Sequence, residues 1–341
     1  MPADGPTGLD ARVPRAVECS DLVVRYGSRT AVDRVSFSAD RGEVLCILGP
    51  NGAGKTSTVE CLEGYRRVAS GSVRVLGLDP VTDHRALVPR IGVMLQRGGV
   101  YPMLAPRRAL RLFASYYTDP EDPEALLDLV RLRPVAGTPW RHLSGGEQAR
   151  LSLALALVGQ PEVVLLDEPT AGVDPEGRLA VREVIGDLRD RGACVLLTTH
   201  ELSEAERVAD RVLMLVGGKV VAEGSPASLA GGPATTKEVT FGAPGGLDLD
   251  ELRLLLGTGA IVTEEQTGRY RVEVGVGEAP GGPGASTDAS PAALAAAVAT
   301  WLAERGIAFS DLRVGRSLEE AYLDMVRAHA TPKTSDQAEA Q

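Results

Sequence analysis

Residues 49–56 read Gly-Pro-Asn-Gly-Ala-Gly-Lys-Thr, which fits the pattern G-x-x-x-x-G-K-[ST] at every fixed position. An apolar run at 44–48 precedes this stretch, and a helical pattern at 56–63 follows it. Glycines let successive backbone N–H groups point inward, and a helix start adds a positive partial charge. A plain glycine turn is the alternative, but the flanking elements favour a phosphate-binding loop for a nucleotide. Lys55 would then reach the β- and γ-phosphates, and the Thr56 hydroxyl would bind Mg²⁺.

The fold around this loop is expected to be α/β. The runs at 44–48, 163–166 and 195–197 are apolar without polar alternation, which is typical of parallel strands covered by helices on both faces. The runs at 22–24 and 73–76 are more amphipathic and indicate an antiparallel flank. Longer helical stretches between these runs complete the pattern.

A chain of 341 residues is typical of about two domains. Glycine and proline around 231–233 predict a boundary between them. The expected parts are a disordered lead at 1–16, a nucleotide-binding domain at 17–232, a small α+β accessory domain at 233–329 and a disordered tail at 330–341. The features expected within the accessory domain are strands at 238–241 and 270–274, a Gly/Pro/Ser stretch at 275–290 and a helix at 291–305.

Charge and hydropathy exclude several classes of protein. The chain carries 36 Lys and Arg against 46 Asp and Glu, a net charge of −10, whereas holding DNA or RNA by its phosphates needs a basic surface. No apolar run reaches the ~18 residues of a membrane-spanning helix, and the polar N-terminus has no signal-peptide core. The four cysteines form neither a CxxC pair nor a zinc pattern. We therefore expect a soluble cytoplasmic protein with buried free thiols and no nucleic-acid partner.

Two further predicted strands end in reactive side chains. Asp167 and Glu168 follow the run at 163–166, and His200 follows the third buried run. Ligands of open parallel sheets bind beyond the carboxyl ends of the strands, and adjacent carboxylates there need a cation or a hydrogen-bond partner. A solvated turn, or an N-cap in the case of His200, is the ordinary alternative. The shared position beside the phosphate loop favours Asp167 in the Mg²⁺ shell and Glu168 on the attacking water.

A second glycine-containing segment opens another predicted helix. Residues 143–148 read Leu-Ser-Gly-Gly-Glu-Gln, and a helical pattern follows at 149–158. Ser144 and Glu147 have the spacing of a capping box, which explains both residues. It does not explain the two consecutive glycines between them, because glycines lower helix stability. We therefore expect a second anion site, which binds either the same nucleotide or that of a second copy paired head to tail.

Taken in order, these motifs resemble the ATP-binding subunits of ABC transporters over roughly residues 17–230. The phosphate loop, the segment at 143–148 and the Asp167-Glu168 pair occur in the order of that family. Further landmarks also match, namely Tyr26, Gln96, the run at 171–174 and His200. The resemblance implies a P-loop NTPase of the ABC type, with a parallel core sheet, an antiparallel flank and a helical subdomain.

The resemblance also implies a role for each matching residue. Tyr26 would stack on adenine, although an ordinary strand tyrosine is the alternative. ATP would also contact the phosphate loop, Gly49, Pro50, Asn51, Gly52, Ala53, Gly54, Lys55, Thr56 and Ser57. Mg²⁺ would be bound by Thr56, Gln96 and Asp167. Hydrolysis would depend on Glu168 as the general base, with Lys55, Gln96 and His200. In a head-to-tail homodimer the γ-phosphate of one subunit would meet Ser144, Gly145, Gly146 and Glu147 of the other, and Asp174 would link the two sites.

The C-terminal segment at 317–323 reads Ser-Leu-Glu-Glu-Ala-Tyr-Leu and resembles a segment of drug-resistance exporters. An amphipathic helix is the alternative, and both interpretations can hold. The resemblance implies a permease in a separate membrane chain, export of drugs, antibiotics or lipids, and a peripheral position on the inner face of the cell membrane. At 104–108 the chain reads Leu-Ala-Pro-Arg-Arg where the family carries Leu-Thr-x-Arg-Glu, so the groove that receives the permease is expected to differ.

A soluble ABC ATPase that performs no transport is the competing hypothesis. Translation-type members carry two nucleotide domains, whereas this chain has one phosphate loop. Chromosome-type members insert a long coiled coil between phosphate loop and signature, but here Lys55 and Leu143 are 143 − 55 = 88 positions apart. Assembly-type members generally lack the C-terminal extension. A regulator with an inactive site conflicts with the presence of Lys55, Asp167, Glu168 and His200, so the sequence favours an ATP-hydrolysing transporter subunit.

Overall fold

The chain divides into two compact units, Met1–Ser225 and Pro226–Gln341. The division falls before the boundary expected around 231–233, and the domain limits of the sequence analysis stay a prediction. The computed structural model describes residues 15–95, 99–230, 236–257, 259–275, 291–315, 318, 319, 321–323 and 326. Gln96, the tail at 330–341 and nearly all of the lead at 1–16 and of the stretch at 275–290 lie outside the described residues.

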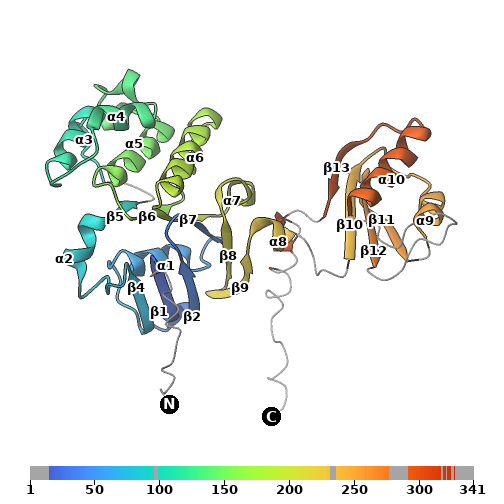
Figure 1. Cartoon of the computed structure of the whole chain (residues 1–341), viewed down its shortest axis with the longest axis horizontal. Helices are drawn as coiled ribbons and strands as arrows, with labels where there is room; N and C mark the ends of the chain where they lie inside the picture. The colour runs from blue at the N-terminus through green and yellow to red at the C-terminus, as the bar shows by residue number, and fades with distance from the viewer. Residues whose placement is uncertain are drawn as a thin grey trace, which may run out of the picture. The chain divides into compact units, whose positions relative to one another are not determined.

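A six-stranded sheet forms the centre of the first unit, in the order β5-β6-β7-β3-β8-β9 (Figure 1). Its strands are β3 (Val44–Leu48), β5 (Ile91–Met94), β6 (Val163–Asp167), β7 (Cys194–Thr199), β8 (Arg211–Val216) and β9 (Lys219–Gly224). All neighbouring pairs are parallel except β8 and β9. Every residue of β3, β6 and β7 is buried, which confirms the prediction of parallel strands covered on both faces.

A three-stranded antiparallel sheet flanks this centre in the order β2-β1-β4. Its strands are β1 (Val17–Tyr26), β2 (Arg29–Ala39) and β4 (Ser70–Val75), so the amphipathic runs of the sequence fall where a flank was expected. Buried aliphatic side chains of both sheets, such as Val24 and Leu45, join Leu62 of the first helix in one core. The cysteines are buried free thiols, as expected: Cys19, Cys46, Cys61 and Cys194.

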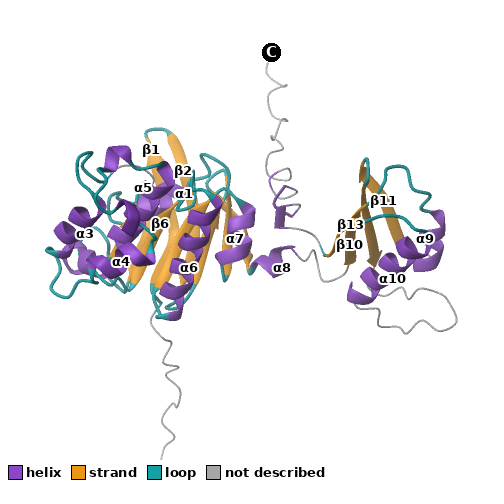
Figure 2. Ribbon diagram, turned by 90° about the horizontal axis from the view of Figure 1, so that it is seen from above, coloured by secondary structure: helices purple, strands orange, loops and turns teal. Residues whose placement is uncertain are grey.

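The helices of the first unit cover the central sheet and extend one end of the unit. They are α1 (Lys55–Leu62), α2 (His84–Leu87), α3 (Pro106–Ala114), α4 (Pro123–Leu129), α5 (Gly145–Leu157), α6 (Pro175–Asp190) and α7 (Leu202–Val208), with 3₁₀ turns η1 (Val88–Arg90), η2 (Arg133–Val135) and η3 (Trp140–His142). Helices α6 and α7 lie in front of the strands in Figure 2, and α3 and α4 lie together at one end. The predicted α/β class, with parallel core, antiparallel flank and helical part, is confirmed.

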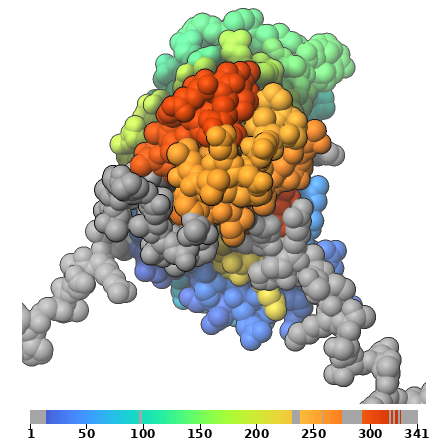
Figure 3. Space-filling view, turned by 90° about the vertical axis from the view of Figure 1, so that its right-hand side faces the viewer, coloured from blue at the N-terminus to red at the C-terminus, as the bar shows by residue number. Residues whose placement is uncertain are grey.

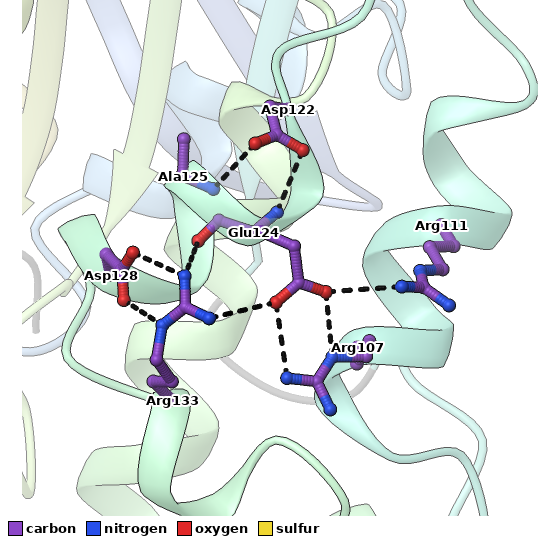
Figure 4. A network of polar contacts seen from close by, with 7 residues as sticks. All are labelled: Arg107, Arg111, Asp122, Glu124, Ala125, Asp128 and Arg133. Atoms are coloured by element: carbon purple, nitrogen blue, oxygen red, sulfur yellow. Dashed lines mark hydrogen bonds and ion pairs between the residues drawn. The ribbon is translucent and has the colours of Figure 1, made fainter.

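A cluster of charged side chains ties α3 to α4 (Figure 4). Glu124 on α4 accepts hydrogen bonds from Arg107 at 2.8 and 3.2 Å and from Arg111 at 3.3 Å, both on α3. Arg133 reaches the same carboxylate at 3.3 Å. Asp122 caps α4 by accepting from the backbone N–H groups of residues 124 and 125.

The second unit is a four-stranded antiparallel sheet with the order β11-β12-β10-β13. Its elements are α8 (Pro226–Ala230), β10 (Thr236–Gly242), α9 (Asp250–Leu256), β11 (Ala260–Gln266), β12 (Arg269–Gly275), α10 (Pro291–Glu304) and β13 (Ser310–Val314). Phe241 and Tyr270 stack with ring centroids 5.1 Å apart, and Trp301 of α10 joins their core. Segments 236–275 and 291–315, gold and orange-red in Figure 3, pack against each other. The expected strand pair and alanine-rich helix are found as β10, β12 and α10, whereas α9, β11 and β13 were missed.

Candidate functional site

The glycine-rich loop joins β3 to α1 at the carboxyl end of the central sheet. Gly52 and Gly54 have φ angles of +81° and +104°, in the left-handed region that glycine adopts without strain. A Cβ on Gly49 would lie 2.3 Å from the carbonyl oxygen of Leu215 on β8. The fixed glycines of the pattern therefore serve the backbone shape, and the loop ends at the first turn of α1.

Lys55 is a buried cation beside two carboxylates. Its Nζ donates to the carbonyl oxygens of Gly49 at 2.8 Å and Pro50 at 3.3 Å, and it lies 3.9 Å from Oε1 of Glu168. Burial lowers the pKa of Lys55, and the charges of Glu168 and Asp167 oppose that shift. The ammonium group is thus held within the loop by two of its carbonyl oxygens, and its contact with phosphates stays a prediction.

Asp167 ends β6 with its side chain almost fully buried. Its Oδ2 accepts a hydrogen bond from Oγ1 of Thr56 at 3.2 Å, and its Oδ1 accepts one from Oγ1 of Thr198 on β7. A hydroxyl and a carboxylate are ligand types that suit Mg²⁺, which takes one or two protein ligands and completes its shell with water and phosphate oxygens. Among the described residues no group of three or more His, Cys, Asp or Glu is placed to hold a metal, so a closed protein cage is absent there. The residues present fit Mg²⁺ arriving with a nucleotide.

Glu168 and His200 meet at the ends of β6 and β7. Nδ1 of His200 lies 3.1 Å from Oε1 of Glu168. Glu168 has a φ of +52°, unusual for a residue other than glycine, and its N–H donates to the carbonyl and the hydroxyl oxygen of Thr198 at 3.2 and 3.1 Å. The neighbouring strand thus holds the backbone in a strained conformation, which turns the carboxylate toward Lys55 and His200.

Tyr26 lies at the end of β1 and contacts the helix that follows the phosphate loop. Its hydroxyl oxygen lies 3.0 Å from Oγ of Ser57 and donates to Oε2 of Glu60 at 3.4 Å. The guanidinium of Arg66 lies over the ring, 4.2 Å from its centroid. Two of the residues expected to contact the nucleotide, Tyr26 and Ser57, are therefore neighbours.

The segment at 143–148 contains the capping box that the spacing suggested. Ser144 caps α5, its Oγ accepts from the N–H of Glu147 at 3.3 Å, and the carboxylate of Glu147 accepts from the N–H of Ser144 at 2.7 Å. A Cβ on Gly146 would lie 3.1 Å from Oδ1 of Asp174, which explains this glycine by packing. A Cβ on Gly145 would lie 3.8 Å from the carbonyl oxygen of Gly172, an ordinary contact distance, so packing leaves this second glycine unexplained.

Asp174 caps α6, with Oδ2 accepting from the N–H of Gly177 at 3.4 Å and Oδ1 lying 3.5 Å from Nη1 of Arg150.

The structure brings the predicted site residues together in two groups. The first group contains Lys55, Thr56, Asp167, Glu168 and His200. The second group contains Ser144, Gly146, Glu147 and Asp174. Among the described residues no hydrogen bond joins the two groups within one chain. Gln96 lies outside the described residues.

Sequence reasoning missed four residues that contact the site. Thr198 bonds both Asp167 and Glu168, and its place two residues before His200 on a buried strand was the available signal. Arg150 meets Asp174, and Glu60 and Arg66 surround Tyr26. The last three contacts join residues that are far apart in the sequence or in different elements, so no local sequence pattern could predict them.

The chain is similar to known proteins of one family. The family described as ABC transporter matches residues 32–171. The Nod factor export ATP-binding protein I of Rhizobium etli is 36% identical over 235 residues, which cover 67% of this chain and 74% of that protein.

Solved structures share the fold of the first unit. A structure described as the ATP-binding subunit of an ABC transporter superposes with a TM-score of 0.58 at 28% identity, over 63% of this chain and 91% of that one. A dimeric ATP-binding cassette in a post-hydrolysis state, bound to ADP and phosphate, superposes with a TM-score of 0.56 at 22% identity, over 61% of this chain and 98% of that one. The second comparison is evidence for the fold alone.

Proposed function

The chain belongs to the ABC transporter family of ATP-hydrolysing, ATP-binding subunits, and we propose that it powers a separate membrane permease that exports drugs, antibiotics or lipids. In this proposal two copies pair head to tail around two MgATP molecules, and hydrolysis separates them. The name of the Rhizobium etli relative supports export as the direction. The segment at 317–323, with its resemblance to drug-resistance exporters, supports the substrate class; Ser317 and Glu320 within it lie outside the described residues.

One observation carries the proposal: two adjacent carboxylates at the end of β6 meet two residues of the phosphate loop. Asp167 is bonded to Thr56, and Glu168 lies 3.9 Å from Nζ of Lys55. A site that binds nucleotide without hydrolysing it needs the phosphate loop. It does not need a carboxylate beside His200, such as that of Glu168. Hydrolysis also needs a group that accepts a proton from the attacking water, and a positioned carboxylate can do this.

In the proposed reaction each residue has a distinct task. Lys55 binds the β- and γ-phosphates, and Glu168 accepts the proton of the attacking water. His200 orients the carboxylate of Glu168 through the 3.1 Å contact and binds the γ-phosphate. Thr56 and Asp167 would hold Mg²⁺, which when bound neutralises charge on the phosphate oxygens. Gln96 is proposed as the further contact that relays the state of the site to the permease.

The proposed dimer uses the exposed start of α5. The capping box satisfies two backbone N–H groups of this helix start through Ser144 and Glu147. Gly145 is exposed and a Cβ on it would approach no atom closer than 3.8 Å, so we propose that the γ-phosphate bound by a second copy approaches its backbone. Asp174 packs against Gly146 and is the proposed link between the two sites.

Exposed apolar side chains near the start of α3 support a protein partner. Leu95, Tyr101 and Met103 are 41%, 76% and 62% exposed. We propose that these side chains form part of one interaction surface, since contiguous exposed apolar patches mark such surfaces. The altered segment at 104–108 is part of this region, where Pro106 begins α3 and Arg107 bonds Glu124. Among the described residues no helix has the length and apolar character needed to cross a bilayer. As part of the proposal, the permease holds the subunit on the inner face of the cell membrane.

Affinity capture from the native cells tests this proposal. A tagged Glu168→Gln chain is trapped with MgATP, the membranes are dissolved gently, and co-purifying chains are identified by mass spectrometry. We expect a polytopic membrane protein in stoichiometric amount. The matched control, Lys55→Ala, is expected to bind no nucleotide and to recover less of that partner. Capture of soluble proteins alone, with none of the chain at the membrane, would replace the proposal with the competing one of an ATPase that performs no transport.

A further inference from the structure

Arg66, Glu60 and Tyr26 form a closed set of contacts next to the phosphate loop. Nε of Arg66 donates to Oε2 of Glu60 at 2.6 Å, and the Tyr26 hydroxyl donates to the same oxygen at 3.4 Å. The guanidinium carbon of Arg66 lies 4.2 Å from the centroid of the Tyr26 ring. The ring is therefore fixed at its hydroxyl end by Glu60 and over one face by Arg66.

Tyr26 stays partly exposed in spite of these contacts. Tyr26 is 43% exposed although Arg66 covers one face, so a substantial part of its side chain borders solvent. The side chains of Arg66 and Glu60 are each 31% exposed, so the ion pair is partly shielded from water. The hydroxyl of Tyr26 also lies 3.0 Å from Oγ of Ser57, two residues after Lys55, which places the hydroxyl end of the ring beside the end of the phosphate loop.

We infer that Arg66, held by Glu60, is a positioning residue that presents the other face of the Tyr26 ring to the base of the nucleotide. The inference rests on the proposed function, because it assumes that adenine stacks on Tyr26. Arg66 touches no part of the nucleotide in this arrangement and acts through the ring. Neither the resemblance nor the sequence pattern assigned a role to Arg66 or Glu60.

Two physical effects support this role. A tyrosine at a strand end would otherwise sample several rotamers, and fixing it before binding removes that entropy cost from the binding step. A cation over one face also draws π-electron density toward itself, which makes the other face a better stacking surface for an electron-rich purine. Both effects act on the base and leave the binding of phosphates unchanged.

Binding to the full chain distinguishes base recognition from general damage. ADP and inorganic tripolyphosphate are titrated separately by calorimetry, because the second ligand has phosphates but no base. For Arg66→Ala we expect ADP to bind about three- to thirty-fold more weakly, with tripolyphosphate unchanged within about twofold. In hydrolysis assays the same variant is expected to raise KM for ATP with little change in kcat.

Three further variants sharpen the test. Arg66→Lys keeps the charge and is expected to recover part of the ADP affinity. Arg67→Ala removes an exposed neighbouring arginine and is expected to behave as wild type. In a Tyr26→Ala background, Arg66→Ala is expected to add no further loss, because the residue acts through the ring.

Each alternative result overturns the inference in a recognisable way. Equal loss of ADP and tripolyphosphate binding would make Arg66 a structural support of the loop. Tighter ADP binding by Arg66→Ala would mean that the guanidinium covers the face that adenine needs. Unchanged ADP binding would remove Arg66 from base recognition while leaving the proposed function intact. Wild-type protein that bound neither ligand would instead reject the proposed function itself.

Discussion

Oγ1 of Thr56 donates a hydrogen bond to Oδ2 of Asp167 over 3.2 Å, so the first turn of α1 is bonded to the carboxyl end of β6. The two residues are 111 positions apart in the chain. The contact brings together the hydroxyl and the carboxylate that suit a Mg²⁺ ion. The fold thus forms the proposed metal position from two motifs that the sequence presents separately.

Asp167→Asn is expected to raise the Mg²⁺ concentration needed for half-maximal ATP hydrolysis by about ten- to a hundred-fold. The substitution keeps the shape of the side chain and removes its charge, and interactions of charged ligands have about this energetic scale. Hydrolysis measured across a series of Mg²⁺ concentrations tests the expectation. ADP binding without Mg²⁺ serves as the control and should change by less than about threefold, because Lys55 and the loop remain. An unaltered Mg²⁺ dependence would remove Asp167 from the metal position.

Glu168→Gln is expected to bind ATP normally and to lose turnover by about 10²- to 10⁴-fold, the usual contribution of a general base. Glutamine preserves the size of the side chain but cannot accept the proton of water. The measurement is single-turnover hydrolysis alongside an ATP titration. A matched control is Glu201→Gln, which changes a carboxylate next to His200 that is paired with Arg178 at 2.6 Å. Near-normal hydrolysis by Glu168→Gln would assign the base to another group.

Ser144→Arg is expected to prevent ATP-driven dimerisation while leaving ATP binding by the monomer intact. An arginine at the start of α5 adds bulk and positive charge where the proposed dimer brings the γ-phosphate of the other subunit against backbone N–H groups. Light scattering after size-exclusion chromatography, on the Glu168→Gln background with ATP, measures the outcome. Ser144→Ala is the control for the lost cap, which costs about 1 kcal/mol. An ATP-dependent dimer of the arginine variant would contradict head-to-tail pairing through this segment.

The parts of the site that could be predicted are those encoded locally. The phosphate loop needs glycines at positive φ, and Gly52 and Gly54 occupy such conformations. The strand ends were equally readable, because β6 and β7 are wholly buried and leave Asp167 and His200 at or just beyond their ends. Parallel strands then place these ends at one edge of the sheet.

The parts that could not be predicted depend on the approach of distant segments. Thr198 bonds Asp167 across two strands, and Arg66 lies over Tyr26 from a turn 40 residues away (66 − 26). Gly146 is a further example. The sequence suggested that this glycine makes room for a ligand, whereas in the structure the approach of Asp174 explains it. In the second unit, α9, β11 and β13 were missed because their sequences carry many charged residues and weak periodicity.

Glu63 lies just beyond the last turn of α1 and is 4% exposed. Burial, with the charges of Asp167 and Glu60, raises its pKa to about 8 from an ordinary value of 4.5. Between these two pH values the folded chain retains a proton that the unfolded chain has released. Its contribution to stability is therefore complete below about pH 4.5 and is lost as the pH rises through 8.

Glu63→Gln is expected to prevent this loss of stability at high pH, since glutamine resembles the protonated carboxyl group and does not ionise. The Tm of the nucleotide-free variant should exceed that of the wild type by at least about 4 °C at pH 8.5, with the difference shrinking toward pH 5. Thermal unfolding followed by circular dichroism across this range provides the comparison. Glu18→Gln, on the exposed side of β1, serves as the control and should show a difference that does not vary with pH. A constant gap between Glu63→Gln and wild type from pH 5 to pH 8.5 would mean that Glu63 ionises in the folded chain as readily as in the unfolded one.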